Sequence, residues 1–331
     1  MRTGRARRFG ITIREAKAGR LSLLFGGHGP GFRCHGGGAM GPVEFAALIV
    51  LGALWGASFL LIRVGVPDFG PVALVGVRLA IASPIVLACA RATGYALPRV
   101  QDWRRWIVVG AINTALPFVL FSVAELRVTA SLGSILNATT PFFAAVLGFA
   151  WLGQRLARGR VVGLLVGLVG VVLVVGWDVG LESPADYLAA LAGLGGGASY
   201  AVGTLLVRRL FPQAGSTTLA AGQQTAAAVL MVPLGAVAWP DAMPGMGAWL
   251  AVVGLGVATT AVAYLIFFWL LARAGALAAL SVTFIIPIFG VGWGAAFLGE
   301  VFGPMQVVGL VTTLVGVALV NEVRLPGLAR A

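Results

Sequence analysis

The 331-residue sequence is poor in charge: Asp, Glu, Lys and Arg together make up 10% of it, whereas soluble proteins carry about 25%. Hydrophobic residues account for 59%, and the mean hydropathy is +0.98. One soluble core cannot bury that much apolar surface, and high hydropathy with low charge excludes a mainly disordered chain. The composition therefore predicts an all-α integral membrane protein, in which each helical crossing needs about 20 apolar residues.

The residue types that carry catalysis or bind metals are also scarce. Lys17 is the sole lysine, both histidines (His28 and His35) lie near the N-terminus, and the two cysteines are Cys34 and Cys89. This set offers neither a disulfide framework nor a CxxC metal site. The apolar runs contain no histidine, lysine or paired acids for acid–base or nucleophilic catalysis, and no phosphate-binding GxxxxGK[ST] loop is present. We therefore expect no enzyme activity, no cofactor and no metal.

Residues 1–43 form a basic, glycine-rich tail that is expected to be disordered. A basic arm that binds anionic lipid or nucleic acid is one interpretation. A signal peptide is not, because the tail has no apolar stretch followed by a cleavage site. Met40 stands directly before the first apolar run, so residues 1–39 are also interpretable as an over-extended start.

Apolar runs separated by charges and prolines predict ten transmembrane helices. Positively charged residues gather in cytoplasmic loops. If the N-terminus is cytoplasmic, twelve arginines of the loops and the C-terminal tail lie on the cytoplasmic side, and only Arg63 and Arg127 lie in outer loops. The N-terminal tail is not included in this count. Both termini are thus expected in the cytoplasm of a multi-pass bacterial inner-membrane protein. The net charge of +12 then reports topology, and no nucleic-acid partner is expected. The predicted helices are 44–66, 70–90, 104–124, 129–151, 161–177, 185–206, 216–238, 247–270, 275–298 and 304–321.

The sequence also repeats itself. At an offset of 146 residues, Pro141 pairs with Pro287 and Gly163 with Gly309, and near the start of each half the offset is 145. Each half then contains five helices, and because five is odd the second half enters the membrane from the opposite side. Inverted repeats of this kind place a substrate site near mid-bilayer, where the halves meet. The predicted units are the first repeat 44–177, a periplasmic linker 178–183, the second repeat 184–320 and a short cytoplasmic tail 321–331.

Several short motifs occur in order along both halves. They are Leu54-Trp55-Gly56-Ala57-Ser58-Phe59, Val77-Arg78-Leu79-Ala80, the small-residue run with Pro141, Leu152-Gly153 followed by Gly163 and Gly170, and Leu298-Gly299-Glu300. With these motifs the chain resembles the EamA family of the drug/metabolite transporter superfamily over residues 44–320. The resemblance implies a ten-helix secondary carrier that typically exports metabolites, amino acids or toxic compounds. The chain departs from the family pattern at Gln154, where an acidic residue is usual, and at Tyr200, the counterpart of Trp55.

Arg78 is the most informative single residue, because a charge inside a span costs roughly 2.5–3.5 kcal/mol on insertion scales. Two roles are open for it: it holds an anionic substrate group or pairs with a carboxylate, or it is a structural arginine that snorkels outward or caps carbonyls to lock the helices. Neutral polar and aromatic side chains at span depth are further candidates for substrate binding, and hydrogen bonding between helices is their alternative role. These candidates are Trp55, Ser58, Asn113, Asn137, Tyr200, Gln223, Tyr264 and Thr283.

Pro141 and Pro287 fall within corresponding predicted helices, where proline removes a backbone hydrogen bond and kinks a helix. We expect either a pair of gate hinges or two static kinks. No acidic residue is predicted in mid-membrane, so a carboxylate at a helix boundary couples protons or the protein is a uniporter or exchanger. Glu125 is expected to form a surface pair with Arg127.

The sequence thus predicts a secondary transporter, expected to be an exporter, that moves a small organic metabolite, an amino-acid-like solute or a drug-like compound by alternating access at the repeat interface. A flippase for a lipid-linked molecule and a non-transporting structural subunit are the alternatives. The expected partners are the small-molecule substrate and membrane lipid, with the protein a monomer or a homodimer.

Overall fold

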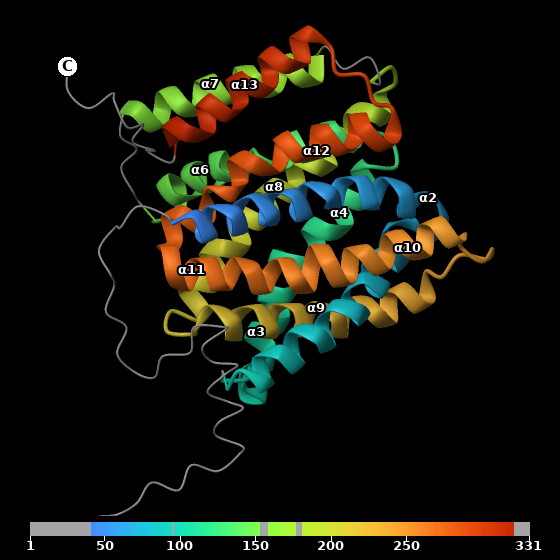
Figure 1. Ribbon diagram of the computed structural model, residues 1–331, viewed down its shortest axis with the longest axis vertical. Coiled ribbons are helices and arrows are strands. Elements are labelled where there is room, and N and C mark those ends of the chain that lie inside the picture. Colours follow the sequence, from blue (N-terminus) through green and yellow to red (C-terminus); the bar gives the residue numbers. More distant parts are fainter. Residues whose placement is uncertain (1–40, 95, 153–157, 177–180, 321–331) are drawn as a thin grey trace, which may run out of the picture.

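The computed structural model describes residues 41–94, 96–152, 158–176 and 181–320, and every regular element among them is helical (Figure 1). Residues 1–40 of the predicted tail 1–43, the predicted tail 321–331, Gln154 and half of the linker 178–183 lie outside the described residues. The elements are α2 (Pro42–Ala92), η1 (Val100–Asp102), α3 (Trp103–Gly110), η2 (Ala111–Ala115), α4 (Leu116–Ala124), α5 (Ala130–Asn137), α6 (Thr140–Leu152), α7 (Arg158–Gly176), α8 (Pro184–Leu210), α9 (Ser216–Val237), α10 (Met246–Gly254), η3 (Leu255–Val262), α11 (Ala263–Leu280), α12 (Val282–Leu298) and α13 (Pro304–Val320).

Seven helical segments in the described part of the chain are long and apolar enough to cross a membrane, and α12 and α13 are shorter apolar helices. One of the seven, α2, has 51 residues and contains two of the predicted helices. Gly70 interrupts it with a φ of 70°, a backbone conformation that glycine adopts without steric cost. The chain turns there, so the first part of α2 (blue) and its second part (cyan) lie apart in Figure 1. The structure is therefore a helical membrane protein with several apolar spans.

Two π-helices occur at corresponding places in the two halves. They are η2 and η3, and the offset of 146 residues carries Ala111–Ala115 onto residues 257–261, which lie within η3. A π-helix is a rare widened turn that is frequent at functional sites. The duplication seen in the sequence therefore extends to a local backbone irregularity.

Helices α7 and α13 pack directly on each other through glycines (Figure 1). A Cβ atom on Gly316 would lie 2.4 Å from Gly167 Cα, and one on Gly170 would lie 2.8 Å from the Gly309 carbonyl oxygen. Both contacts are with backbone atoms that cannot move aside. Gly167 and Gly170 of α7 thus face Gly316 and Gly309 of α13, which lets the backbones approach closely.

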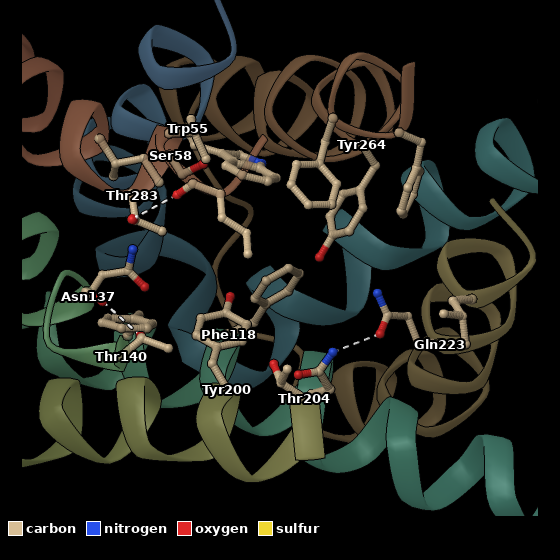
Figure 2. Close-up of a pocket in the computed structure, with 18 of the residues that line it drawn as sticks. Trp55, Ser58, Phe118, Asn137, Thr140, Tyr200, Thr204, Gln223, Tyr264 and Thr283 are labelled. Carbon is tan, nitrogen blue, oxygen red and sulfur yellow. Dashed lines mark hydrogen bonds between the residues drawn. The ribbon is translucent and has the colours of Figure 1, made fainter. Parts of the chain in front are cut away.

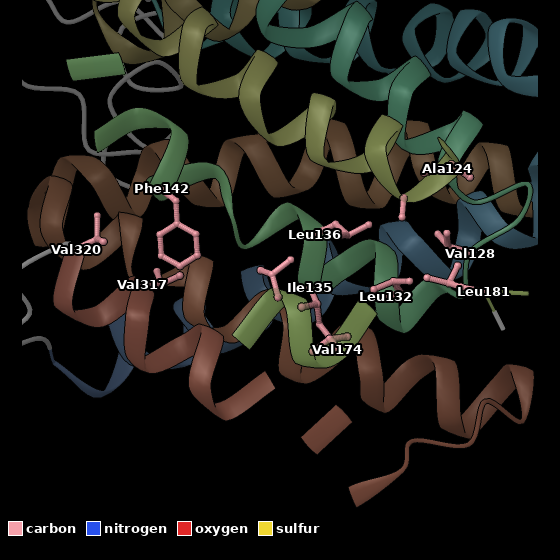
Figure 3. Close-up of a cluster of buried hydrophobic side chains, with 13 residues drawn as sticks. Ala124, Val128, Leu132, Ile135, Leu136, Phe142, Val174, Leu181, Val317 and Val320 are labelled. Carbon is pink, nitrogen blue, oxygen red and sulfur yellow. The ribbon is translucent and has the colours of Figure 1, made fainter. Parts of the chain in front are cut away.

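Buried apolar side chains join this outer helix pair to the rest of the bundle (Figure 3). Phe142 of α6 lies among Val171 of α7 and Val317 of α13, and Leu132 and Leu136 of α5 continue the same cluster. The cluster fills the space between α7, α13 and the inner helices, and its members do not line the cavity described below.

Contacts between connecting segments define two ends of the bundle. At one end Arg273 Nε lies 3.1 Å from Glu44 Oε1, and the Thr218 hydroxyl donates to the Ala96 carbonyl. At the other end Asp68 accepts a hydrogen bond from the backbone N–H of Gly245 over 2.8 Å. We call residues 42–46, 91–94, 96–103, 207–219 and 271–281 the Arg273 end, and residues 66–70, 123–131, 181–186, 238–246 and 299–304 the Glu125 end.

Candidate functional site

A cavity of about 400 Å³ lies among helices of both halves. Its lining comes from α2, η2, α4, α5 and α6 of the first half and from α8, α9, α11 and α12 of the second (Figure 2). Every residue that the sequence predicted for substrate binding lies in this lining. These residues are Trp55, Ser58, Arg78, Asn113, Asn137, Tyr200, Gln223, Tyr264 and Thr283.

Arg78 is the only charged residue among the described residues that line the cavity, and its side chain is buried. Its Nε donates to the Thr260 hydroxyl over 2.8 Å, and its guanidinium lies 3.8 Å from the centre of the Phe118 ring. No carboxylate of the described residues forms an ion pair with it. Thr260 and the Phe118 ring therefore orient the Arg78 guanidinium, and the described residues supply no negative charge that pairs with it.

Neutral polar groups lie on two sides of the cavity. The amide nitrogen of Asn113, in η2, donates to Gln223 Oε1 of α9 over 2.8 Å, which links the two halves across the cavity wall (Figure 2). The Asn113 Oδ1 atom and the Ser58 hydroxyl are buried without a hydrogen-bond partner among the described residues. A buried polar atom that is left unpaired costs about 1–3 kcal/mol, so both atoms are suited to bind a polar solute.

Aromatic rings form much of the remaining wall. Trp55 packs against Tyr264 and Phe267, with ring centres 5.9 and 5.4 Å apart, and Tyr200 stacks on Phe121 at 6.2 Å. Aromatic faces provide contact area and attract cations. The wall can therefore contact both the apolar part and a positively charged group of a bound solute.

The cavity extends toward only one end of the bundle. Its lining includes Val207, Ser216 and Leu271, which lie at the Arg273 end. Toward the Glu125 end its lining ends at Phe59, Ile62 and Phe121, and the Phe59 and Phe121 rings meet edge to face at 5.7 Å. The structure thus has a cavity that is closed at the Glu125 end by an aromatic pair.

Pro141 and Pro287 do not line the cavity, and their local structures differ. Pro287 lies inside α12, as the sequence predicted. Pro141 is instead the second residue of α6, because the predicted helix 129–151 is broken between Asn137 and Thr140. The helix is therefore interrupted just before Pro141, which then lies in a first turn, where proline is well tolerated. A role as gate hinges stays a prediction.

The predicted surface pair of Glu125 and Arg127 was also wrong. Glu125 has no exposed surface, whereas Arg127 forms an ion pair of 3.2 Å with Asp186. Asp186 is held there because Ser183 begins α8 as its N-cap, and the two residues form a capping box. The packing of α5 and α8 around the end of α4 covers Glu125, and residue type alone does not reveal that.

Glu125 lies between the apolar segments Val100–Ala124 and Ala130–Trp151. Neither of its carboxylate oxygens has a hydrogen-bond partner among the described residues. Burial raises the pKa of the Glu125 carboxyl well above its ordinary value; the charge of Arg63 opposes this shift and that of Glu300 adds to it.

Several lining residues were not predicted, among them Phe118, Thr204 and Phe267. An apolar or small residue in an apolar helix has no local feature that separates a cavity wall from a lipid-facing or packed surface. Phe118 lies against Arg78, which belongs to a different segment of the chain. The sequence does not contain that pairing.

A bundle of apolar helices from a duplicated chain, with a cavity between the duplicated halves, has the architecture of a membrane carrier. The chain belongs to the EamA-like transporter family, whose sequence profile matches residues 44–176 and again residues 187–322. It is therefore a secondary membrane transporter with two EamA domains, and not an enzyme.

Proteins similar in sequence to this chain carry transporter names. The chain is 27% identical over 279 residues to a "probable terminal-alkyne amino-acid exporter" of Streptantibioticus cattleyicolor, covering 83% of this chain and 92% of that protein. It is 26% identical over 280 residues to the uncharacterized inner membrane transporter YedA of Escherichia coli, covering 84% and 90%. A solved crystal structure shares the fold with a TM-score of 0.61 at 20% identity, covering 84% of this chain and 96% of the other.

Proposed function

We propose that this transporter exports a small solute with a carboxylate group, of the size and type of an amino acid, across the bacterial inner membrane. The observation that carries the proposal is Arg78, a buried guanidinium that lines the cavity and has no ion-pair partner among the described residues. A substrate carboxylate would neutralise the charge of the Arg78 guanidinium and accept short, strong hydrogen bonds from it.

The rest of the cavity suits such a solute. A volume of about 400 Å³ lies in the range of small-molecule sites. The Trp55 and Tyr264 rings offer contact to an aliphatic or aromatic side chain and to an ammonium group. Ser58 and Asn113 offer unpaired polar atoms. The name of the Streptantibioticus cattleyicolor relative, an amino-acid exporter, points to the same class of substrate.

The proposed mechanism is alternating access between two inverted five-helix repeats, with both termini in the cytoplasm. The split of α2 at Gly70 and the two shorter helices α12 and α13 are compatible with ten crossings. Arginines lie at the Arg273 end, which supports a cytoplasmic location for that end. The conformation described, with a cavity that extends to the Arg273 end, then corresponds to an inward-facing state. These arginines are Arg91, Arg99, Arg208, Arg209 and Arg273.

The test is a thermal-stability screen of the purified protein in nanodiscs. The panel pairs each of the common amino acids with its amide and with its decarboxylated amine. A ligand that binds the folded state alone raises the melting temperature, and a concentration of 100 times Kd adds about 2.7 kcal/mol of stability. We expect one or more carboxylate compounds to stabilise the protein while the matching amides and amines do not.

Arg78→Gln should remove this stabilisation, whereas Arg105→Gln should leave it unchanged, since Arg105 is exposed and pairs with Asp102 outside the cavity. Counterflow of the stabilising compound in liposomes then measures transport. Equal stabilisation by acids and amines, or an Arg78→Gln protein that still responds, would contradict the proposal.

A further inference from the structure

Glu125 is the one buried carboxylate of the described residues for which neither oxygen has a hydrogen bond. The other acidic groups near it are engaged. Glu300 accepts hydrogen bonds from the backbone N–H groups of Ala130 and Ser131 over 2.8 and 3.0 Å. Asp186 is bonded by Ser183 and paired with Arg127. Glu125 therefore differs from its neighbours in having no partner for an ionised side chain.

The surroundings of the Glu125 carboxyl are apolar or already occupied. It lies against α5, where a Cβ on Gly133 would be 3.1 Å from Oε1 and 3.2 Å from Phe59 Cδ1. Arg63 of α2 donates to the backbone carbonyl oxygen of Glu125 rather than to its carboxylate. An ionised carboxylate without water or hydrogen bonds is strongly disfavoured, and such a group becomes neutral instead.

The position of Glu125 links this chemistry to the closed end of the cavity. Phe59 and Phe121 line this end of the cavity. Phe59 and the Glu125 carboxyl both lie against Gly133, and Phe121 lies one helical turn before Glu125. Separation of this aromatic pair would admit water to the Glu125 end. The carboxyl would then be hydrated beside Arg63, which favours its ionised form.

We propose that Glu125 is a proton-binding site, and that proton binding there stabilises closure of the Glu125 end. When this end opens, the carboxyl releases its proton to the water that enters; when it closes, the carboxylate takes a proton from that water. This proposal rests on the transport function proposed above, because it assigns the closed end to one state of a transport cycle.

The direction of the pH dependence follows from the two states. The closed state binds a proton that the open state releases, so closure is favoured at low pH and opening at high pH. The charged groups that face Glu125 are Arg63 and Arg78 of α2 and Glu300 after α12. Of the two carboxylates, Glu300 accepts hydrogen bonds from the backbone N–H groups of Ala130 and Ser131, whereas Glu125 has no hydrogen-bond partner among the described residues, so we assign the proton to Glu125.

The test measures the distance between spin labels at Leu126→Cys and Val301→Cys, in a chain with Cys34→Ser and Cys89→Ser. Both sites are exposed, at 43% and 86%, and lie in loops of different halves at the Glu125 end. Pulsed electron resonance in nanodiscs follows the distance from pH 5 to pH 9 without any substrate. We expect a second, longer distance whose ratio to the short one rises about tenfold per pH unit before it levels off.

Glu125→Gln, which resembles the protonated side chain, should show the short distance at every pH. Glu182→Gln is the matched control, since Glu182 is an exposed carboxylate at the same end, and it should respond as the parent does. A parent distance that ignores pH, or a Glu125→Gln protein that still responds, would overturn the proposal.

If the Gln variant does not fold, infrared spectroscopy of the parent protein keeps the proposal testable. A protonated carboxylic acid should be visible at pH 7 and should be lost, together with growth of the longer distance, as the pH rises. Its absence at pH 7 would refute proton binding at Glu125. Neither measurement involves a substrate, so a negative result leaves the cavity and its Arg78 test unaffected.

Discussion

Arg78 donates its Nε hydrogen to the hydroxyl of Thr260 over 2.8 Å. The bond joins α2 of the first half to the π-helix η3 of the second. Thr260 can accept it because its own hydroxyl donates to the Leu255 carbonyl five residues earlier, as the π-helix geometry allows. A local irregularity of the backbone thus orients the charge in the cavity.

Thr260→Val keeps the shape of this side chain and removes the acceptor. Hydrogen bonds to charged groups contribute about 1.5–3 kcal/mol, so we expect the compound found by the stability screen to bind roughly tenfold more weakly. Thr259→Val is the matched control, since Thr259 lies in the same π-helix and its hydroxyl donates to the Leu255 carbonyl and not to Arg78. Titration calorimetry measures both affinities, and equal affinities would show that Thr260 does not orient Arg78.

Gly316→Ala should destabilise the pairing of α7 and α13. The added methyl would lie 2.4 Å from Gly167 Cα, and backbone cannot yield as a side chain can. Overpacking of this kind costs about 1–3 kcal/mol, which should lower the melting temperature. Gly292→Ala is the control, because a Cβ there meets nothing within 4 Å and alanine favours a helix. A Gly316→Ala protein as stable as the control would contradict the close packing.

Glu300→Ala should loosen the start of α5. Gly299 ends α12 with a φ of 66°, and this left-handed turn directs Glu300 toward the N-H groups of Ala130 and Ser131. Loss of such a cap costs about 1 kcal/mol, so hydrogen exchange of these two amides should accelerate roughly fivefold. Glu182→Ala, at an exposed position, should leave the exchange rates unchanged. Unaltered exchange in Glu300→Ala would show that the cap is not formed.

The orientation can be measured with a membrane-impermeant maleimide on intact cells. Glu182→Cys and Gln213→Cys lie at exposed positions at the two ends of α8, and each is placed in a chain without Cys34 and Cys89. We expect residue 182 to react from outside and residue 213 only after the cells are broken. Ser183 is unsuitable for this test because it caps α8. The reverse labelling pattern would place the Glu125 end in the cytoplasm.

The candidate site was largely predictable because polar side chains are energetically unfavourable in an apolar helix and therefore stand out in the sequence. Arg78 and Asn113 stand out from the residues around them, and the structure brings both to one cavity. The same reasoning fails for Glu125, which follows directly on an apolar segment and whose burial depends on what packs over it. It also does not locate the break at Ala138 and Thr139, which places Pro141 in the first turn of α6.

Two neighbouring residues show where prediction from sequence stops. Gln223 lines the cavity and bonds to Asn113, whereas Gln224 is fully buried and does not line it. Both are glutamines of α9 at the same depth along the helix. Their side chains differ only in the direction in which they leave the helix. Packing of α9 against α2 and α3 sets the rotation of α9 about its axis, and this rotation decides which of the two faces the cavity.

The sequence by itself determined the membrane class, the helical architecture, the duplication and the family, because hydropathy, loop charge and repeated glycines and prolines are properties of consecutive residues. The tertiary structure decided which polar groups face the cavity, which end of it is closed, and that Glu125 is buried without a partner. These features depend on contacts between segments far apart in the chain, and the energy of a polar or charged group depends on what those contacts leave around it.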